Sequence, residues 1–243
     1  MPYYGKSCFM KRKEGMNIRS TEKKKVIITI DGPAGAGKST VSKALAEKLG
    51  YLYLDTGSLY RALAYQALKS ETPLNNESAL ADLCSRTEIK LKNIDGKMKV
   101  FLDGMDVAEN IRSEEVGVAA SKISAYAAVR QCLFHLQRQA GADGKLVAEG
   151  RDMGTVVFPH ADYKFYLDAS MEERTKRRLN ELLEKRKPAE YQSVQKDIMA
   201  RDQQDTTRQL SPLKIPADAI IIDSTNLSVA EVVKKIFESI LNK

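Results

Sequence analysis

The chain has 243 residues, of which 43% are hydrophobic and 29% charged, so it is long enough to bury a substantial core without disulfide bonds. No apolar run approaches the roughly 18 residues of a membrane-spanning helix, which excludes that class of protein. The formal net charge is +7, but residues 1–25 hold eight basic and two acidic residues, so the rest of the chain is nearly neutral. We therefore expect neither a membrane nor a nucleic acid as partner.

Residues 1–24 are expected to form a flexible basic extension, followed by one domain over residues 25–243. The extension has no apolar run, which excludes a secretory signal peptide and a membrane anchor. Met16 follows Gly15, as in a segment from an expression vector or one that precedes a later start codon, so we expect the extension to be dispensable. An arm that attracts phosphate groups is the alternative.

The cysteine and histidine content bounds the chemistry further. The chain contains three cysteines, an odd number without CxxC spacing, and two histidines. This composition indicates a reducing compartment and argues against a zinc site. We therefore expect a cytoplasmic protein.

The domain begins with two strand and helix pairs. A β-branched run at 26–30 predicts a buried parallel strand, and helical spacing of apolar residues predicts a helix from residue 39 to a C-cap at Gly50. A second strand is predicted at 51–54, and a second helix follows at 58–68. Thr72-Pro73 then ends this unit.

The middle of the chain has a different pattern. Short apolar runs separated by Asp-Gly turns predict a small antiparallel insertion over 88–107. An alanine-rich segment over 113–139 predicts a helix with a break near Ala125-Tyr126. Further strands are predicted at 146–148, 163–167 and 219–222.

Two helix starts carry the signature of a capping box, Ser170 with Glu173 and Ser228 with Glu231. Pro188 interrupts the helical region that follows the first of them. The alternation of strands and helices predicts an α/β fold with three layers, α/β/α, around a parallel sheet. This core domain carries two inserted pieces.

A glycine-rich segment between the first strand and the first helix fits the phosphate-loop (P-loop) motif GxxxxGK[ST]. Its backbone N–H groups and the helix N-terminus favour phosphate, Lys38 can reach the β- and γ-phosphates, and Ser39 can hold Mg²⁺. A chance glycine turn is the alternative. The expected ATP-binding residues are Gly32, Pro33, Ala34, Gly35, Ala36, Gly37, Lys38, Ser39 and Thr40.

Hydrolases, motors and small-molecule kinases share this loop, so other residues must indicate the acceptor of the phosphoryl group. The sequence has no Asn/Thr-Lys-x-Asp guanine signature, and no hydrophobic run that ends in Asp is evident. The nearest equivalent of such a run is Leu146-Val-Ala-Glu149.

Arginines recur at positions that face the phosphate loop. Residues 55–61 and 149–155 each follow a predicted core strand, and both contain an arginine and an acidic residue. Arg201, Asp205 and Arg208 have the spacing of one helix face. Three arginines from three segments indicate bidentate capture of a second phosphate, whereas each alone is more typical of a solvated surface. Asp152 is alternatively an ion-pair partner of Arg151 or a loop cap.

These segments resemble the bacterial cytidylate kinase family, whose members are nucleoside monophosphate kinases. The resemblance covers residues 26 to about 240 and depends on four motifs, at 30–40, 54–61, 149–159 and 167–174. It implies a monophosphate-binding (NMP) insertion at about 74–115. It also implies a mobile helical lid at about 172–190.

The resemblance also implies roles for individual residues, by matching position. Arg61, Arg151 and Arg208 would hold the CMP phosphate. Other residues would contact the ribose or complete the monophosphate site: Thr56, Tyr60, Arg201 and Asp205. Ser121, Arg130 and Asp152 would read the base, and a carboxylate beside Arg and Ser donors is complementary to the amino group, N3 and O2 of cytosine.

Two positions depart from the pattern of the family. Thr56 replaces a serine of some members, with the same hydroxyl chemistry, and Glu149 replaces an aspartate, which leaves its relation to Mg²⁺ open. Lid arginines would neutralise charge in the transition state, although a solvated helix face is the alternative. The candidates are Arg174, Arg177, Arg178 and Arg186. The expected catalytic set is Lys38, Arg174 and Arg178.

We expect transfer of the γ-phosphoryl group of Mg²⁺-bound ATP to CMP or dCMP, forming ADP and CDP or dCDP in pyrimidine nucleotide metabolism. The protein is expected to act as a monomer. A kinase for UMP or another phosphorylated metabolite is the nearest alternative. A nucleotide-dependent RNA-binding protein is the alternative from another class, and the near-neutral domain argues against it.

Overall fold

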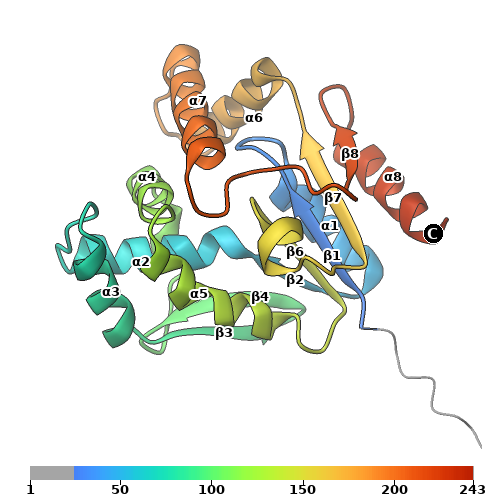
Figure 1. Ribbon diagram of the computed structural model, residues 1–243. Coiled ribbons are helices and arrows are strands. Elements are labelled where there is room, and N and C mark those ends of the chain that lie inside the picture. The colour runs from blue at the N-terminus through green and yellow to red at the C-terminus, as the bar shows by residue number, and fades with distance from the viewer. Residues whose placement is uncertain (1–24, 243) are drawn as a thin grey trace, which may run out of the picture.

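A mostly parallel sheet forms the centre of the structure, a computed structural model that describes residues 25–242 (Figure 1). The order across it is β3-β4-β2-β6-β1-β7-β8, and β5 pairs with β4. The expected extension over 1–24 lies outside the described residues. The central parallel strands are β1 (Ile27–Asp31), β2 (Leu52–Asp55), β6 (Leu146–Gly150), β7 (Tyr163–Asp168) and β8 (Ile220–Asp223).

The two faces of this sheet are covered by different helices, as the alternation of side chains along each strand requires. Ile28 and Ile30 of β1 are fully buried against α1 (Lys38–Leu49) and α8 (Val229–Leu241). On the other face, Leu146 of β6 packs with the end of α5 (Ala127–Ala140) and with the π-helix η2 (Met153–Val157). The predicted α/β fold around a parallel sheet is therefore confirmed.

The first two βα units match the sequence closely. Helix α1 ends at Gly50, whose φ of 63° lies in the left-handed region, as the C-cap prediction requires. Helix α2 (Thr56–Lys69) begins directly after β2, because the Asp55 carboxylate accepts a hydrogen bond from the backbone N–H of Ser58. This short connection places the first turn of α2 at the end of the sheet.

The predicted antiparallel insertion is present as β3 (Ile89–Ile94), β4 (Lys97–Leu102) and β5 (Met105–Asp106). A helix that the sequence analysis did not predict, α3 (Glu77–Arg86), precedes it. The Asn76 side chain caps α3 by accepting from the N–H of Ala79, and the helix buries two leucines. A 3₁₀ turn, η1 (Asn110–Arg112), follows the insertion.

The predicted break in the alanine-rich segment is confirmed. Helix α4 (Glu114–Ile123) ends there, and α5 starts after Tyr126, whose ψ of 137° is extended rather than helical. Each helix packs on a different neighbour, α4 against α2 and α5 against α3. Together with β3 and β4 they enclose a hydrophobic core of their own.

The last helices lie above the carboxyl ends of the strands and beside α1. Helices α6 (Met171–Glu184) and α7 (Tyr191–Thr207) form an antiparallel pair at the top of Figure 1, on either side of Pro188. The capping box at Ser228 is confirmed. At Ser170 the hydroxyl caps the N–H of Glu173, but the Glu173 carboxylate binds Arg177 instead of returning to Ser170, so that box is incomplete.

Arg208 is the C-cap of α7 and lies outside its helical part, so the expectation of one helix face for Arg201, Asp205 and Arg208 is wrong for Arg208.

Within residues 25–242, no helix combines the length and the apolar character that crossing a membrane requires.

Candidate active site

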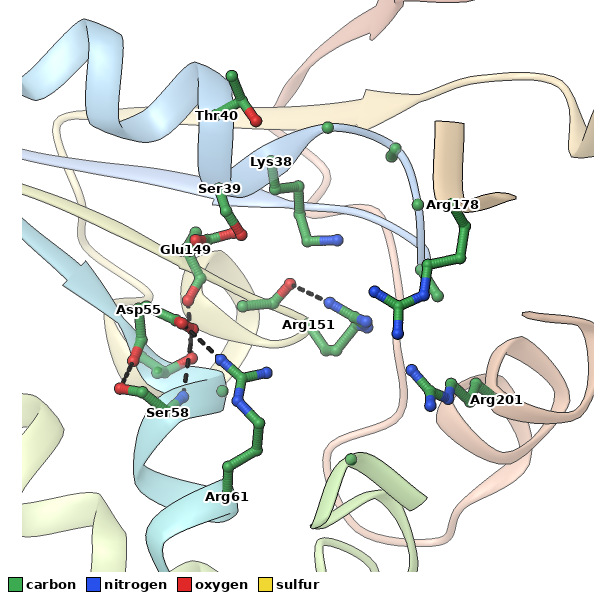
Figure 2. Close-up of a pocket in the computed structure, with 18 of the residues that line it drawn as sticks. Lys38, Ser39, Thr40, Asp55, Ser58, Arg61, Glu149, Arg151, Arg178 and Arg201 are labelled. Atoms are coloured by element: carbon green, nitrogen blue, oxygen red, sulfur yellow. Dashed lines mark hydrogen bonds and ion pairs between the residues drawn. The ribbon is translucent and has the colours of Figure 1, made fainter. Parts of the chain in front are cut away.

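A cavity of about 1170 Å³ opens at the carboxyl ends of β1, β2 and β6. Its walls come from the phosphate loop, α2, α4, the turn after β6, and α6 and α7. Figure 2 shows the charged ends of five basic side chains pointing into this space: Lys38, Arg61, Arg151, Arg178 and Arg201. Because ligands of open parallel sheets bind at this edge, the cavity is the candidate active site.

The phosphate loop lines one end of the cavity from Ala34 to Thr40, whereas Gly32 and Pro33 lie behind it. Gly37 is the N-cap of α1 with a φ of 88°, and the open N-terminus of α1 therefore faces the cavity. The Lys38 ammonium donates a hydrogen bond to the backbone O of Pro33 at 2.6 Å. Burial, and then the charge of Arg151, lowers the pKa of Lys38 to about 7.

Glu149 and Ser39 form an oxygen-rich corner beside the loop. The buried Glu149 carboxylate accepts a hydrogen bond from the hydroxyl of Tyr53. Burial, and then the charge of Asp55, raises the pKa of Glu149. Glu149 stands out in the sequence at the end of a predicted strand, whereas no local pattern indicates Tyr53, whose role depends on pairing between β2 and β6.

This corner fits Mg²⁺ in the way usual for nucleotide enzymes. Mg²⁺ prefers oxygen ligands and is held through one or two protein groups together with substrate phosphates and water. Among the described residues, no cluster of three or more His, Cys, Asp or Glu side chains offers a self-sufficient metal site. The Ser39 hydroxyl and the Glu149 carboxylate are therefore the groups available to an ion that arrives with ATP.

The three arginines expected to bind a phosphate are held by carboxylates. Arg61 pairs with Asp55 at 2.6 Å, and Arg151 donates from Nε to Asp205 at 2.7 Å. Burial alone would lower the pKa of Arg151, but Asp205 reverses this effect and the pKa is raised. Nη2 of Arg208 is buried without a hydrogen-bond partner, although Oδ1 of Asp152 lies 3.9 Å away as an ion-pair partner. Such an unsatisfied donor in a cavity wall is expected where a ligand completes the hydrogen bonding.

The expected base-reading residues also meet. Arg130 of α5 forms an ion pair with Asp152, and Asp152 has no such pair with Arg151. Burial raises the pKa of Asp152. The Arg130 guanidinium lies over the Tyr60 ring, 5.8 Å from its centroid, and Ser121 lines the same wall.

The arginines of α6 and α7 divide into two groups. Arg178 and Arg201 line the cavity and both bind the carboxylate of Glu114, a residue that no pattern in the sequence indicates. Arg177 also lines it and donates to Ser224. Arg174 is different: it does not line the cavity, its side chain is 8% exposed, and its donors bind protein oxygens. The cavity lining likewise does not include Arg186, the fourth lid candidate.

Comparison with known proteins identifies the family of this site. The cytidylate kinase family model matches residues 28–242. The cytidylate kinase of Desulfitobacterium hafniense is 49% identical over 214 residues, which cover 88% of this chain and 92% of the relative. The cytidylate kinase of Caldicellulosiruptor bescii is 45% identical over 215 residues, which cover 88% and 95%.

A solved structure of an uncharacterized protein from Eubacterium ventriosum is similar in fold alone. It has a TM-score of 0.50 and 11% sequence identity, with 90% of this chain and 99% of that chain covered. The family model and the curated relatives extend over nearly all of the described residues. The chain therefore belongs to the cytidylate kinase family.

Proposed function

We propose that this chain transfers the γ-phosphoryl group of ATP to CMP or dCMP and forms ADP with CDP or dCDP. As a member of the cytidylate kinase family, it is an ATP-dependent nucleoside monophosphate kinase. The observation that carries the proposal is the row of arginines opposite the phosphate loop, Arg61, Arg151 and Arg208, with the unsatisfied Nη2 of Arg208 among them. Two anion sites in one cavity suit a phosphate donor and a phosphate acceptor.

The chemistry requires positioning and charge neutralisation rather than a covalent enzyme intermediate. An oxygen of the acceptor phosphate attacks the γ-phosphorus in line, and the bond to the bridging oxygen of ADP breaks. Lys38 exchanges its bond to Pro33 for the donor phosphates, while Arg178 stabilises charge on the transferred group from the opposite wall. Mg²⁺ bound near Ser39 and Glu149 would supply further positive charge to the donor phosphates.

Base recognition supports cytosine. The Asp152 carboxylate can accept from the exocyclic amino group, and Arg130 and Ser121 can donate to N3 and O2. Uracil presents the opposite pattern at this edge, so its binding would leave a buried polar group unpaired, at a cost of about 1–3 kcal/mol. Thr56 and Tyr60 would complete the monophosphate site, with Arg201 and Asp205 beside the ribose.

Two parts of the fold are proposed to move or to shape the acceptor site. Residues 172–190, which include all of α6 except its first residue, would act as the lid that excludes water from the donor phosphates. Residues 74–115 would form the wall beside the monophosphate. The free thiols of Cys84 and Cys132 fit a reducing cytoplasm, and we propose that the protein acts there as a monomer.

The test is a coupled assay of ADP release with ATP and Mg²⁺ and a panel of acceptors: CMP, dCMP, UMP, AMP and none. We expect turnover with CMP or dCMP and at least tenfold weaker kcat/KM with UMP. Preferential turnover of UMP or AMP would overturn the base assignment and keep the kinase. ATP hydrolysis that needs no acceptor would overturn the whole proposal.

A further inference from the structure

One residue of the phosphate loop is held by both of the last helices before β8. The backbone N–H of Ala34 donates to Oδ1 of Asp202 on α7 at 3.0 Å. The backbone O of Ala34 accepts from Nη1 of Arg174 on α6 at 2.9 Å. The same Nη1 also bonds to the second carboxylate oxygen of Asp202. Ala34, Arg174 and Asp202 thus form a closed ring of three contacts, which we call the loop clamp.

Of the three residues of the loop clamp, Ala34 lines the cavity, whereas the two side chains that hold it lie outside the cavity wall. The Arg174 and Asp202 side chains are 8% and 16% exposed, and neither residue is part of the cavity wall. Nε of Arg174 is additionally fixed on the backbone O of Ala169, directly after β7. From this position the Arg174 guanidinium cannot contact a ligand phosphate in the cavity. It instead determines where the loop backbone lies.

The neighbouring glycine shows how closely α6 approaches the loop. A Cβ built at Gly35, whose φ is 77°, would lie 3.0 Å from Cβ and 3.1 Å from the backbone O of Arg174. The loop therefore packs directly on the first turn of α6. A shift of α6 or α7 must be followed by Ala34 and Gly35, or it must break the clamp.

Helix α7 connects this clamp to the acceptor side of the cavity. Arg201 and Asp205, on either side of Asp202 in sequence, both line the cavity, and Asp205 holds Arg151. A single helix thus carries a contact to the donor loop and contacts to the acceptor site. Two sites that share one rigid element are energetically coupled when ligands change its position.

Resting on the proposed function, we propose that Arg174 and Asp202 are positioning residues that couple the phosphate loop to helix α7, so that CMP in the acceptor site raises the affinity for ATP. By reciprocity, ATP raises the affinity for CMP by the same factor. Arg174 then acts through Ala34 rather than on the transferred phosphate.

The test measures binding of a fluorescent ATP analogue and of CMP, each with and without the other, to the full chain. In Asp202→Ala we expect about tenfold weaker ATP binding and loss of the effect of CMP on ATP affinity. Binding of CMP alone should stay within about twofold, which separates this result from general unfolding. Gln203→Ala, an exposed neighbour on α7, is the matched control and should keep the coupling.

Two further variants can still test the proposal if Asp202→Ala folds poorly. Asp202→Asn retains an acceptor for the N–H of Ala34, the contact that joins the loop to α7, so it should recover most of the ATP affinity and of the coupling. Arg174→Met, which removes the contact to the backbone O of Ala34, should also weaken the coupling, and its effect should be less than additive with that of Asp202→Ala because the two side chains contact each other.

If CMP does not change the ATP affinity of the wild-type protein, the proposed coupling is wrong. A folded Asp202→Ala variant with wild-type coupling would overturn the role of the clamp. Failure of CMP to be phosphorylated in the acceptor panel would instead overturn the proposed function, so the two failures are distinguishable.

Discussion

Arg130 and Asp152 form an ion pair in the cavity wall although they are 22 residues apart in sequence and belong to different elements. Their side chains are only 11% and 4% exposed. Burying two charges is costly even when they are paired, so this pair is weak evidence for stability and marks a candidate functional position. It fixes an acceptor and a donor at the position where we propose the cytosine edge to lie.

Asp152→Asn tests that assignment. The amide keeps the shape of the side chain but presents an N–H donor, which suits O4 of uracil and opposes the amino group of cytosine. We expect the ratio of kcat/KM for CMP to that for UMP to fall at least tenfold in the ADP-release assay. Asp143→Asn, at an exposed site before β6, is the matched control. An unchanged ratio in the folded variant would exclude Asp152 as a base reader.

Lys38→Met should lower the activity without lowering the stability. Lys38 is 6% exposed and burial lowers its pKa to about 7, so the folded protein bears a cost for this ammonium group. We expect kcat to fall at least about 100-fold, as when one preorganised charge is removed from a transition state, with an unfolding temperature no lower than that of the wild type.

The control for that experiment is Lys48→Met, which removes a lysine from the last turn of the same helix outside the cavity. It should keep its kcat. Near-normal turnover of Lys38→Met would contradict the phosphate-loop assignment.

Local signals were sufficient for the donor half of the site. A β-branched strand, a glycine-rich turn and a helix closed by Gly50 each depend on neighbouring residues, and β1, the loop and α1 follow the predicted bounds within two residues. The rule that parallel strands end at one edge was sufficient to bring residues 55–61 and 149–152 to the loop.

Contacts between distant elements could not be predicted, because sequence spacing contains no register between separate helices. Glu114 binds Arg178 and Arg201 across 64 and 87 positions, and nothing near Glu114 indicates either partner. Arg174 and Arg178 lie in the same charge-dense helix, and only tertiary packing shows that one is buried and the other lines the cavity. Helix α3 does have a local signal, the Asn76 cap with leucines three residues apart, although the helix is not among the predicted elements.

Asp31 gives the folded protein a specific pH dependence. Its fully buried carboxylate accepts from the N–H groups of Met153 and Gly154 at 2.9 and 2.7 Å. Burial raises its pKa from 3.8 to about 6. Because the folded state then binds the proton more tightly than the unfolded state, the contribution of Asp31 to stability is largest below about pH 4 and decreases as the pH rises to about 6.

We expect this decrease to be about 3 kcal/mol in the free energy of unfolding, given 1.36 kcal/mol per pKa unit. Urea unfolding of the wild type and Asp31→Asn across pH 4 to 8 measures it, because other titrating groups cancel in the difference between the two curves. The free energy of unfolding of the wild type minus that of Asp31→Asn should decrease with rising pH and become constant above about pH 7. A constant difference would show that the pKa of Asp31 is the same in both states.

Residue 32 requires glycine because the backbone of β7 lies too close for a side chain, and not because of the phosphate. It does not line the cavity, its φ is 152°, and a Cβ there would lie 2.0 Å from the backbone O of Leu167 in β7. Neither backbone can retreat without breaking the pairing of β1 with β7, so Gly32→Ala should lower the free energy of unfolding by about 3 kcal/mol or more. Gly50→Ala meets no atom within 4 Å and should cost only the left-handed strain of about 1–2 kcal/mol. Equal losses in urea unfolding would show that conformation, and not the close approach of β7, requires glycine at residue 32.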